Sequence, residues 1–107
     1  LEKARAVSQQ YQRPVLITEI GFTSTTTPWA APYEDGEGGH YSGAAQLKCY
    51  AMATNVLSET ADWCRGVLWW KYPSYPTLGG KGHTGFTPNN KPAEQQLPLL
   101  FRQLPKD

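Results

Sequence analysis

The chain has 107 residues and a formal net charge of +1, with ten lysines and arginines against nine acidic residues. This length suits one small domain with a modest core, and no apolar stretch approaches the roughly 20 residues that span a bilayer. Because positive and negative charges are mixed along the sequence, neither a nucleic acid nor a membrane surface is expected as a partner.

The first expected element is a helix over residues 2–11, in which Ala4, Val7 and Tyr11 recur at the spacing of one amphipathic face. Pro14 should end this helix, because proline disfavours helical backbone in the residue before it. The helical pattern is already under way at the first residue, which is a leucine. We therefore expect the chain to be a piece of a longer polypeptide.

A buried strand is expected over residues 15–20, where an apolar run leads into Glu19 and then Gly21. Such runs are typical of a strand buried on both faces, as in a parallel sheet covered by helices. Glu19 lies where this strand leaves the core, at the end where α/β proteins bind ligands. We interpret Glu19 as a catalytic carboxylate. The alternative is a structural acid that pairs with an arginine or caps a helix.

A long polar loop and a second helix follow this strand. The loop covers about residues 21–42, is rich in glycine and proline, and has a length typical of functional or disordered loops. The second helix is expected over residues 43–60, with Ser42 as its N-cap. Its inward side chains are expected to be Leu47, Tyr50 or Ala51, Thr54 and Leu57.

A second buried strand is expected over residues 66–70. Strand alternation sends Trp69 and Trp70 to opposite faces, so one should face the strand ends and the other should pack against a helix. Sugar rings have apolar C–H faces that pack on flat aromatic rings, so aromatic side chains beside a carboxylate favour a carbohydrate site. The further aromatic candidates near the strand ends are Trp29, Tyr33, Tyr72 and Tyr75. For each single side chain, packing in the core is the alternative.

The rest of the chain is a second loop and a last helix. The loop, over residues 71–90, is again rich in glycine and proline. The helix is expected over residues 91–104, with Pro92 suited to its first turn. Pro98 should kink or restart this helix, because proline has no N–H to donate.

The alternation of helices and strands indicates an α/β fold in which the two strands pair in parallel through right-handed crossovers. Both long loops then lie at the C-terminal ends of the strands, which is the functional face of a (β/α) barrel. Two strands cannot close a barrel. The chain is therefore expected to be one quarter of a (β/α)8 TIM barrel.

The histidines and cysteines do not indicate a metal site. His40 and His83 lie in the long loops without cysteines or carboxylates at ligand spacing, so substrate hydrogen bonding or solvent exposure is expected, and no cofactor is implied. Cys49 lies about two helical turns, roughly 11 Å, before the end of its helix, and Cys64 lies beyond that end. Two buried free thiols are expected in place of a disulfide.

Four segments carry a family resemblance: VLITEIGF, PWAAP, GAAQLKCYAMA and GVLWWKYP, the last continued by HTGFTPNNKPAEQQL. In this order they resemble the C-terminal end of a retaining (β/α)8-barrel glycoside hydrolase, in particular its endo-β-mannanase-like members. The segments are similar to the seventh strand, the loop after it, the seventh helix, and the eighth strand with its loop and closing helix. The resemblance implies that residues 1–107 are a partial barrel domain whose N-terminal units lie outside this chain.

The resemblance also implies roles for single residues. Glu19 would be the nucleophile, and Trp69 or Trp70 would form the floor of the subsite beside the cleaved bond. Trp29, Tyr72 and His83 are further candidates for contacts with an oligo- or polysaccharide. The acid/base would be a second Glu at the end of the fourth strand, outside this chain, so the chain needs the rest of the barrel as its partner and should be inactive alone.

Two other functions fit the same sequence. A non-catalytic carbohydrate-binding or scaffold protein would keep the barrel without the pair of acids. A self-standing α/β domain would associate through its exposed strand edges, although two strands leave both edges open and much apolar surface uncovered. The residue at the end of the fourth strand would distinguish the enzyme from the binding protein.

Overall fold

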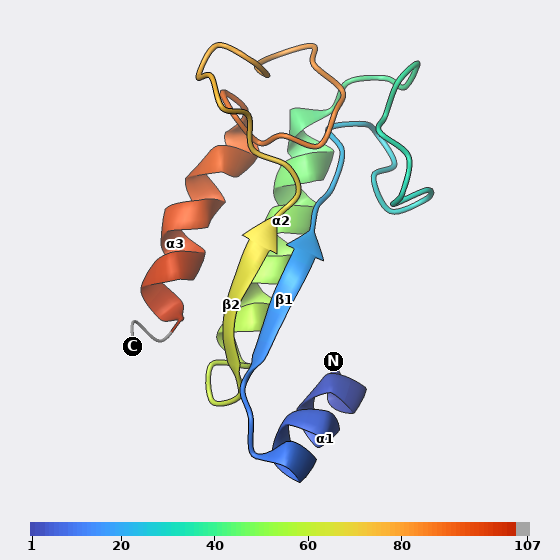
Figure 1. Cartoon of the computed structure of the whole chain (residues 1–107). Helices are drawn as coiled ribbons and strands as arrows, with labels where there is room; N and C mark the ends of the chain where they lie inside the picture. Colours follow the sequence, from blue (N-terminus) through green and yellow to red (C-terminus); the bar gives the residue numbers. More distant parts are fainter. Residues whose placement is uncertain (105–107) are drawn as a thin grey trace.

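A two-stranded parallel sheet forms the centre of the fold, as the alternation of elements predicts. The computed structural model describes residues 1–104. Strand β1 (Val15–Ile20) lies beside β2 (Cys64–Trp69), with Val15 opposite Cys64 and Ile20 opposite Trp69. Both strands therefore end at the same edge of the sheet, and the two long loops leave from that edge (Figure 1).

The helices are α1 (Glu2–Tyr11), α2 (Gly43–Ser58), the 3-10 helix η1 (Pro92–Gln95) and α3 (Gln96–Gln103). The predicted ranges of the first three elements agree with the structure to within two residues, while β2 begins two residues earlier and ends one residue earlier than expected. The last helix is divided in two, because the backbone changes from 3-10 to α geometry at Gln96. Pro98 lies in the first turn of α3, where its missing N–H needs no partner, which agrees with the predicted restart of the helix.

Helix α2 begins as predicted but has a different buried face. The Ser42 hydroxyl accepts a hydrogen bond of 3.1 Å from the Ala45 N–H, which confirms the N-cap. Tyr50, Thr54 and Leu57 are buried as expected. The expected Leu47 is only half-buried, and Gln46 is fully buried instead. The Gln46 amide takes this place because its nitrogen lies within hydrogen-bonding distance of the Phe22, Phe86 and Thr87 carbonyls.

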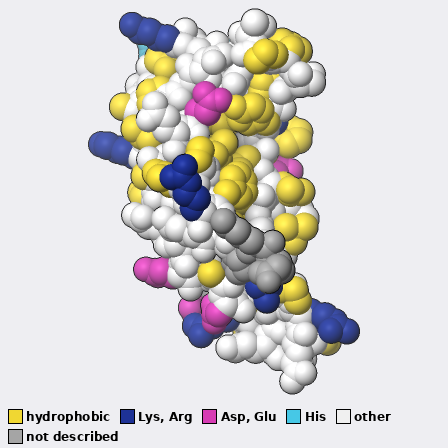
Figure 2. Space-filling model, turned by 90° about the vertical axis from the view of Figure 1, so that its left-hand side faces the viewer, with side chains coloured by type: hydrophobic (Ala, Val, Ile, Leu, Met, Phe, Trp, Pro, Cys, Tyr) yellow, Lys and Arg dark blue, Asp and Glu magenta, His cyan; other side chains and the backbone are white. Residues whose placement is uncertain are grey.

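The core lies between one face of the sheet and helices α2 and α3. Its buried centre consists of Leu57, Val67, Leu100 and Leu104, with Ile17, Ile20, Ala53 and Trp69 packed around them. Cys49 and Cys64 are both buried and free, as expected. Charged side chains are scattered over the face of the molecule seen in Figure 2, and hydrophobic side chains run between them.

The opposite face of the sheet is open among residues 1–104, so the expectation of strands buried on both faces is wrong for this part of the chain. Leu16 is 53% exposed and Leu68 is 55% exposed on these strands. Helix α1 does not cover them, because it lies beyond the start of β1 (Figure 1). Its predicted apolar face is also uncovered, with Val7 and Tyr11 both exposed.

These elements make a mixed α/β domain with a parallel sheet. Within the described residues, no helix combines the length and the apolar character required to cross a bilayer.

Candidate active site

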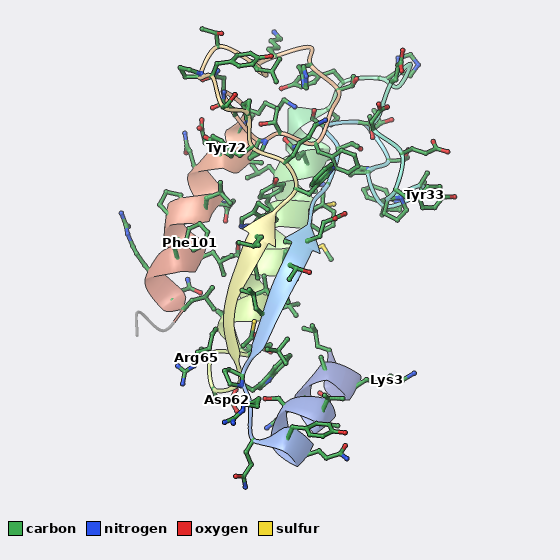
Figure 3. The ribbon with its side chains drawn as sticks, viewed as in Figure 1. Lys3, Tyr33, Asp62, Arg65, Tyr72 and Phe101 are labelled. Carbon is green, nitrogen blue, oxygen red and sulfur yellow. The ribbon has the colours of Figure 1, made fainter. Side chains whose placement is uncertain are left out.

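Glu19 lies one residue before the end of β1, with its carboxylate exposed on the side where the long loops leave the sheet. It lines a hollow whose other walls come from the end of β1, from both long loops and from the residue that follows β2. Tyr33 projects from the first long loop (Figure 3). The walls of this hollow are Ile20, Gly21, Pro32, Tyr33, Trp70 and Phe86. The parallel register thus brings a carboxylate and an indole to one surface.

The two neighbouring tryptophans point in different directions, as strand alternation predicts. Trp70 is 46% exposed and lines the Glu19 hollow. The Nζ of Lys71 lies 5.8 Å from the centre of the Trp70 ring. Trp69 instead stacks on Tyr50 of α2, with ring centroids 4.3 Å apart, and packs against the core. Only Trp70 therefore shares a surface with Glu19.

Gly21 allows the two strand ends to approach each other closely. The Trp70 N–H donates a hydrogen bond of 2.7 Å to the Ile20 carbonyl. A Cβ atom on Gly21 would lie only 2.1 Å from the Trp70 carbonyl oxygen. The absence of a side chain at Gly21 therefore sets the distance between the Glu19 strand and Trp70. The glycine after the acid was visible in the sequence, but the contact that requires it was not.

Tyr72 and His83 lie together in a second cleft, between the two long loops. Lys71, Glu37 and Phe86 line the same cleft. Phe86 also borders the Glu19 hollow, and Lys71 directly follows Trp70, so the two depressions adjoin. The Tyr72 and His83 side chains thus lie in a cleft next to the hollow that holds Glu19.

Tyr72 is held by the helix that follows its loop. Its hydroxyl donates to a carboxylate oxygen of Glu94, and this hydrogen bond together with partial burial raises the pKa of Tyr72 to about 12. The other oxygen of Glu94 accepts a hydrogen bond of 3.1 Å from the Asn90 N–H. One carboxylate therefore joins Tyr72, near the start of the loop after β2, to Asn90 at the end of that loop.

Lys91 is a buried residue of this region that the sequence did not single out. Its side chain is 5% exposed, and its Nζ lies 2.8 Å from Ser24 Oγ, 3.1 Å from His83 Nδ1 and 3.1 Å from the Gly85 carbonyl. Burial lowers the pKa of Lys91 to about 8. Desolvation, and then the charge of Lys91, lower the pKa of His83. A lysine before a proline carries no sequence signal that separates it from a surface lysine.

The sequence model of Glycoside Hydrolase Family 113 matches residues 1–91 of the chain. The chain belongs to glycoside hydrolase family 113. This match confirms the resemblance to a mannanase-like glycoside hydrolase, and it makes a carbohydrate the expected class of substrate. Neither the curated proteins nor the solved structures include a match to this chain.

Two other candidate residues, Trp29 and His40, do not line the Glu19 hollow. Trp29 lines an apolar groove between β1 and α2, together with Ile17, Met52 and other hydrophobic side chains. His40 lines a polar hollow formed by the first long loop. In residues 1–104 of this family 113 chain, no group of three His, Cys, Asp or Glu side chains is arranged to hold a metal ion.

Proposed function

We propose that this chain supplies the nucleophile and a sugar-stacking surface of a retaining glycoside hydrolase that cleaves a β-linked polysaccharide. Family membership supports the reaction class. The observation that carries the residue assignment is that Glu19 and Trp70 line one hollow at the ends of adjacent parallel strands. Strand ends of this kind are where barrel enzymes hold their catalytic side chains.

In this mechanism, a carboxylate oxygen of Glu19 attacks the anomeric carbon while the bond to the leaving sugar breaks. A second carboxylic acid gives its proton to the leaving oxygen and then activates the water that hydrolyses the glycosyl-enzyme. Retention needs the two carboxyl groups at about 5–5.5 Å. Among the described residues, Glu19 is the only acid that lines its hollow. The acid/base therefore comes from another part of the barrel.

Trp70 is the proposed platform for the sugar beside the cleaved bond. Its half-exposed indole offers a flat apolar surface next to Glu19, whereas Trp69 is committed to its stack with Tyr50. Tyr72 and His83 would contact sugars further along the polysaccharide, because their cleft adjoins the Glu19 hollow. Trp29 is 62% exposed, and its apolar groove shares Ile20 with the Glu19 hollow, so this side chain remains a candidate for a further sugar contact.

The open surfaces of the sheet support a partial barrel. Each strand has one unpaired edge among residues 1–104, and Leu16 and Leu68 are exposed on the open face. In a closed (β/α)8 barrel, neighbouring strands would pair with these edges and side chains from all eight strands would cover that face. We propose that residues 1–107 contribute the seventh and eighth β/α units, and that the remaining N-terminal part of the barrel completes them.

The test uses the complete protein that carries this chain. Glu19→Gln should lower hydrolysis of soluble β-mannan and other β-linked polysaccharides by at least about a thousandfold, because the amide is a poor nucleophile. Affinity for an oligosaccharide should remain. Asp62→Asn is the matched control, since Asp62 lies at the opposite end of the sheet (Figure 3). Activity of Glu19→Gln within a few-fold of the wild type would refute the assignment.

A chemical label identifies the nucleophile directly. A 2-deoxy-2-fluoroglycoside slows breakdown of the glycosyl-enzyme, so the sugar should stay attached to the peptide that contains Glu19. Attachment to another acid would reassign the nucleophile. If the wild-type protein binds oligosaccharides but hydrolyses none, the non-catalytic carbohydrate-binding or scaffold function holds instead.

A further inference from the structure

We propose that Lys91 is a positioning residue that fixes the proton of His83 on Nε2, so that His83 donates a hydrogen bond to a sugar oxygen in the cleft beside Glu19. The identity of the ligand rests on the proposed function. The state of the imidazole rests only on the contacts of Lys91. The proposal adds a hydrogen-bonding role for a histidine to the nucleophile and the aromatic platform.

The contacts of Lys91 use every hydrogen of its ammonium group. Nζ carries three hydrogens, and it has three acceptors within 3.1 Å: Ser24 Oγ, His83 Nδ1 and the Gly85 carbonyl. None of these partners is a carboxylate, so the buried charge is balanced by oriented dipoles instead of an ion pair. His83 Nδ1 is therefore one of the groups that makes the burial of Lys91 possible.

The geometry then determines the tautomer of His83. An ammonium group can only donate, so Nδ1 of His83 must accept and carries no proton. A neutral imidazole with a bare Nδ1 has its proton on Nε2. Protonation of Nδ1 would place two donors face to face, which agrees with the lowered pKa of His83 beside Lys91. His83 is thus a neutral ring with Nε2 as a donor.

The His83 ring is also confined by its neighbours. The Ser24 hydroxyl donates to the His83 carbonyl at 2.5 Å, which ties the histidine backbone to the first long loop. A Cβ atom on Gly85 would lie 2.8 Å from His83 Cε1, so the ring packs directly on the backbone there. Lys91, Ser24 and Gly85 together restrict rotation of the ring and hold its Nδ1 edge toward the interior.

The other edge of the ring has room for a ligand. His83 is half-buried and lines the cleft, together with Lys71 and Tyr72. The charged side chains around this cleft also include Asp35 and Glu37. Within residues 1–104, Nε2 has no hydrogen-bond partner, whereas Nδ1 is engaged by Lys91. A hydroxyl or ring oxygen of a saccharide is an acceptor of the kind that this N–H requires.

Nuclear magnetic resonance tests the tautomer without any substrate. In the complete protein with ¹⁵N-labelled histidine, the His83 signals are assigned by their loss in His83→Gln. At about pH 7, they should show a protonated Nε2 and a bare Nδ1. Lys91→Met should reduce this preference to the modest excess of the Nε2–H form that a free imidazole shows, and Lys91→Arg should retain more of it because arginine also only donates. A protonated Nδ1 in the wild type, or an unchanged spectrum in Lys91→Met, would overturn the proposal.

Binding tests the donor in a Glu19→Gln background, where the oligosaccharide is not cleaved. In His83→Gln the amide nitrogen can reach the position of Nε2, whereas the shorter His83→Asn places its amide near Nδ1. Affinity should be about tenfold weaker in His83→Asn than in His83→Gln, as expected for one lost hydrogen bond. Equal affinities would refute the donor role. If the wild type hydrolyses no saccharide, the proposed function fails while the tautomer result stands.

Discussion

Trp69 and Tyr50 stack face to face, with ring centroids 4.3 Å apart and ring planes at 13° to each other. This stack joins the end of β2 to α2 and places Trp69 in the core. The next residue, Trp70, is half-exposed beside Glu19. Trp69 therefore packs in the core while Trp70 faces the Glu19 hollow, and substituting each one separately should distinguish these two roles.

Trp69→Ala should mainly reduce stability, by about 3–5 kcal/mol, because it removes a large side chain that packs against the core. Trp70→Ala should mainly weaken binding of a β-linked oligosaccharide, by about tenfold, because it removes a flat surface beside Glu19. Thermal unfolding and calorimetric titration of both variants measure the two effects. A large loss of stability in Trp70→Ala with unchanged affinity would contradict this division.

Gly21→Ala should disturb the site and the fold together. The new Cβ would lie 2.1 Å from the Trp70 carbonyl oxygen, so the two strand ends must separate. We expect a loss of about 1–3 kcal/mol in unfolding free energy, together with a fall in kcat. Gly66→Ala is the matched control, because its Cβ would meet only the flexible end of the Leu16 side chain, at 3.3 Å. Equal effects of the two substitutions would argue against a special role for Gly21.

The buried charge of Lys91 predicts a specific dependence of stability on pH. Burial lowers its pKa in the folded state to about 8, below the ordinary lysine range of the unfolded chain. Between these values the unfolded chain binds more protons, so the unfolding free energy contributed by Lys91 rises as pH rises above about 8. Thermal unfolding at about pH 7 and about pH 9.5 measures this change. In Lys91→Met the rise should be absent, and an equal rise in both proteins would refute the assignment.

Glu94→Gln should lower the pKa of Tyr72 from its value of about 12, because the hydrogen bond to the Glu94 carboxylate is the main cause of the shift. An alkaline titration followed by ultraviolet absorbance measures ionisation of the phenol. The part of the absorbance change that belongs to Tyr72 is the part that disappears in Tyr72→Phe. If the wild-type and Glu94→Gln titrations coincide, the hydroxyl does not depend on Glu94 for its protonated state.

Local patterns in the sequence predicted most of the fold. The strand at Val15–Ile20 follows from its apolar run, and the start of α2 follows from Ser42. The proximity of Glu19 and Trp70 was also predictable, because parallel strands bring their C-terminal ends to one edge. These features depend on neighbours in sequence or on the direction of the chain.

The features that the sequence did not reveal depend on distant partners. Lys91 is buried because Ser24, 67 positions earlier, offers it an acceptor. Gln46 is buried because carbonyls of both long loops, including those of Phe22 and Phe86, accept its amide. Trp29 lies in a loop without periodicity, so no pattern could show that its ring would face an apolar groove.

The carboxylate of Glu94 closes the loop after β2 at its base. Since it binds Tyr72 at one end and Asn90 at the other, the loop is closed into a ring beside the sheet. The entropy lost on closing a ring grows only slowly with its length. Residues inserted at the exposed tip of the loop, near Lys81 and Gly82, should therefore cost little, while the segment from His83 to Phe86 stays tied to Ser24, Gln46 and Lys91.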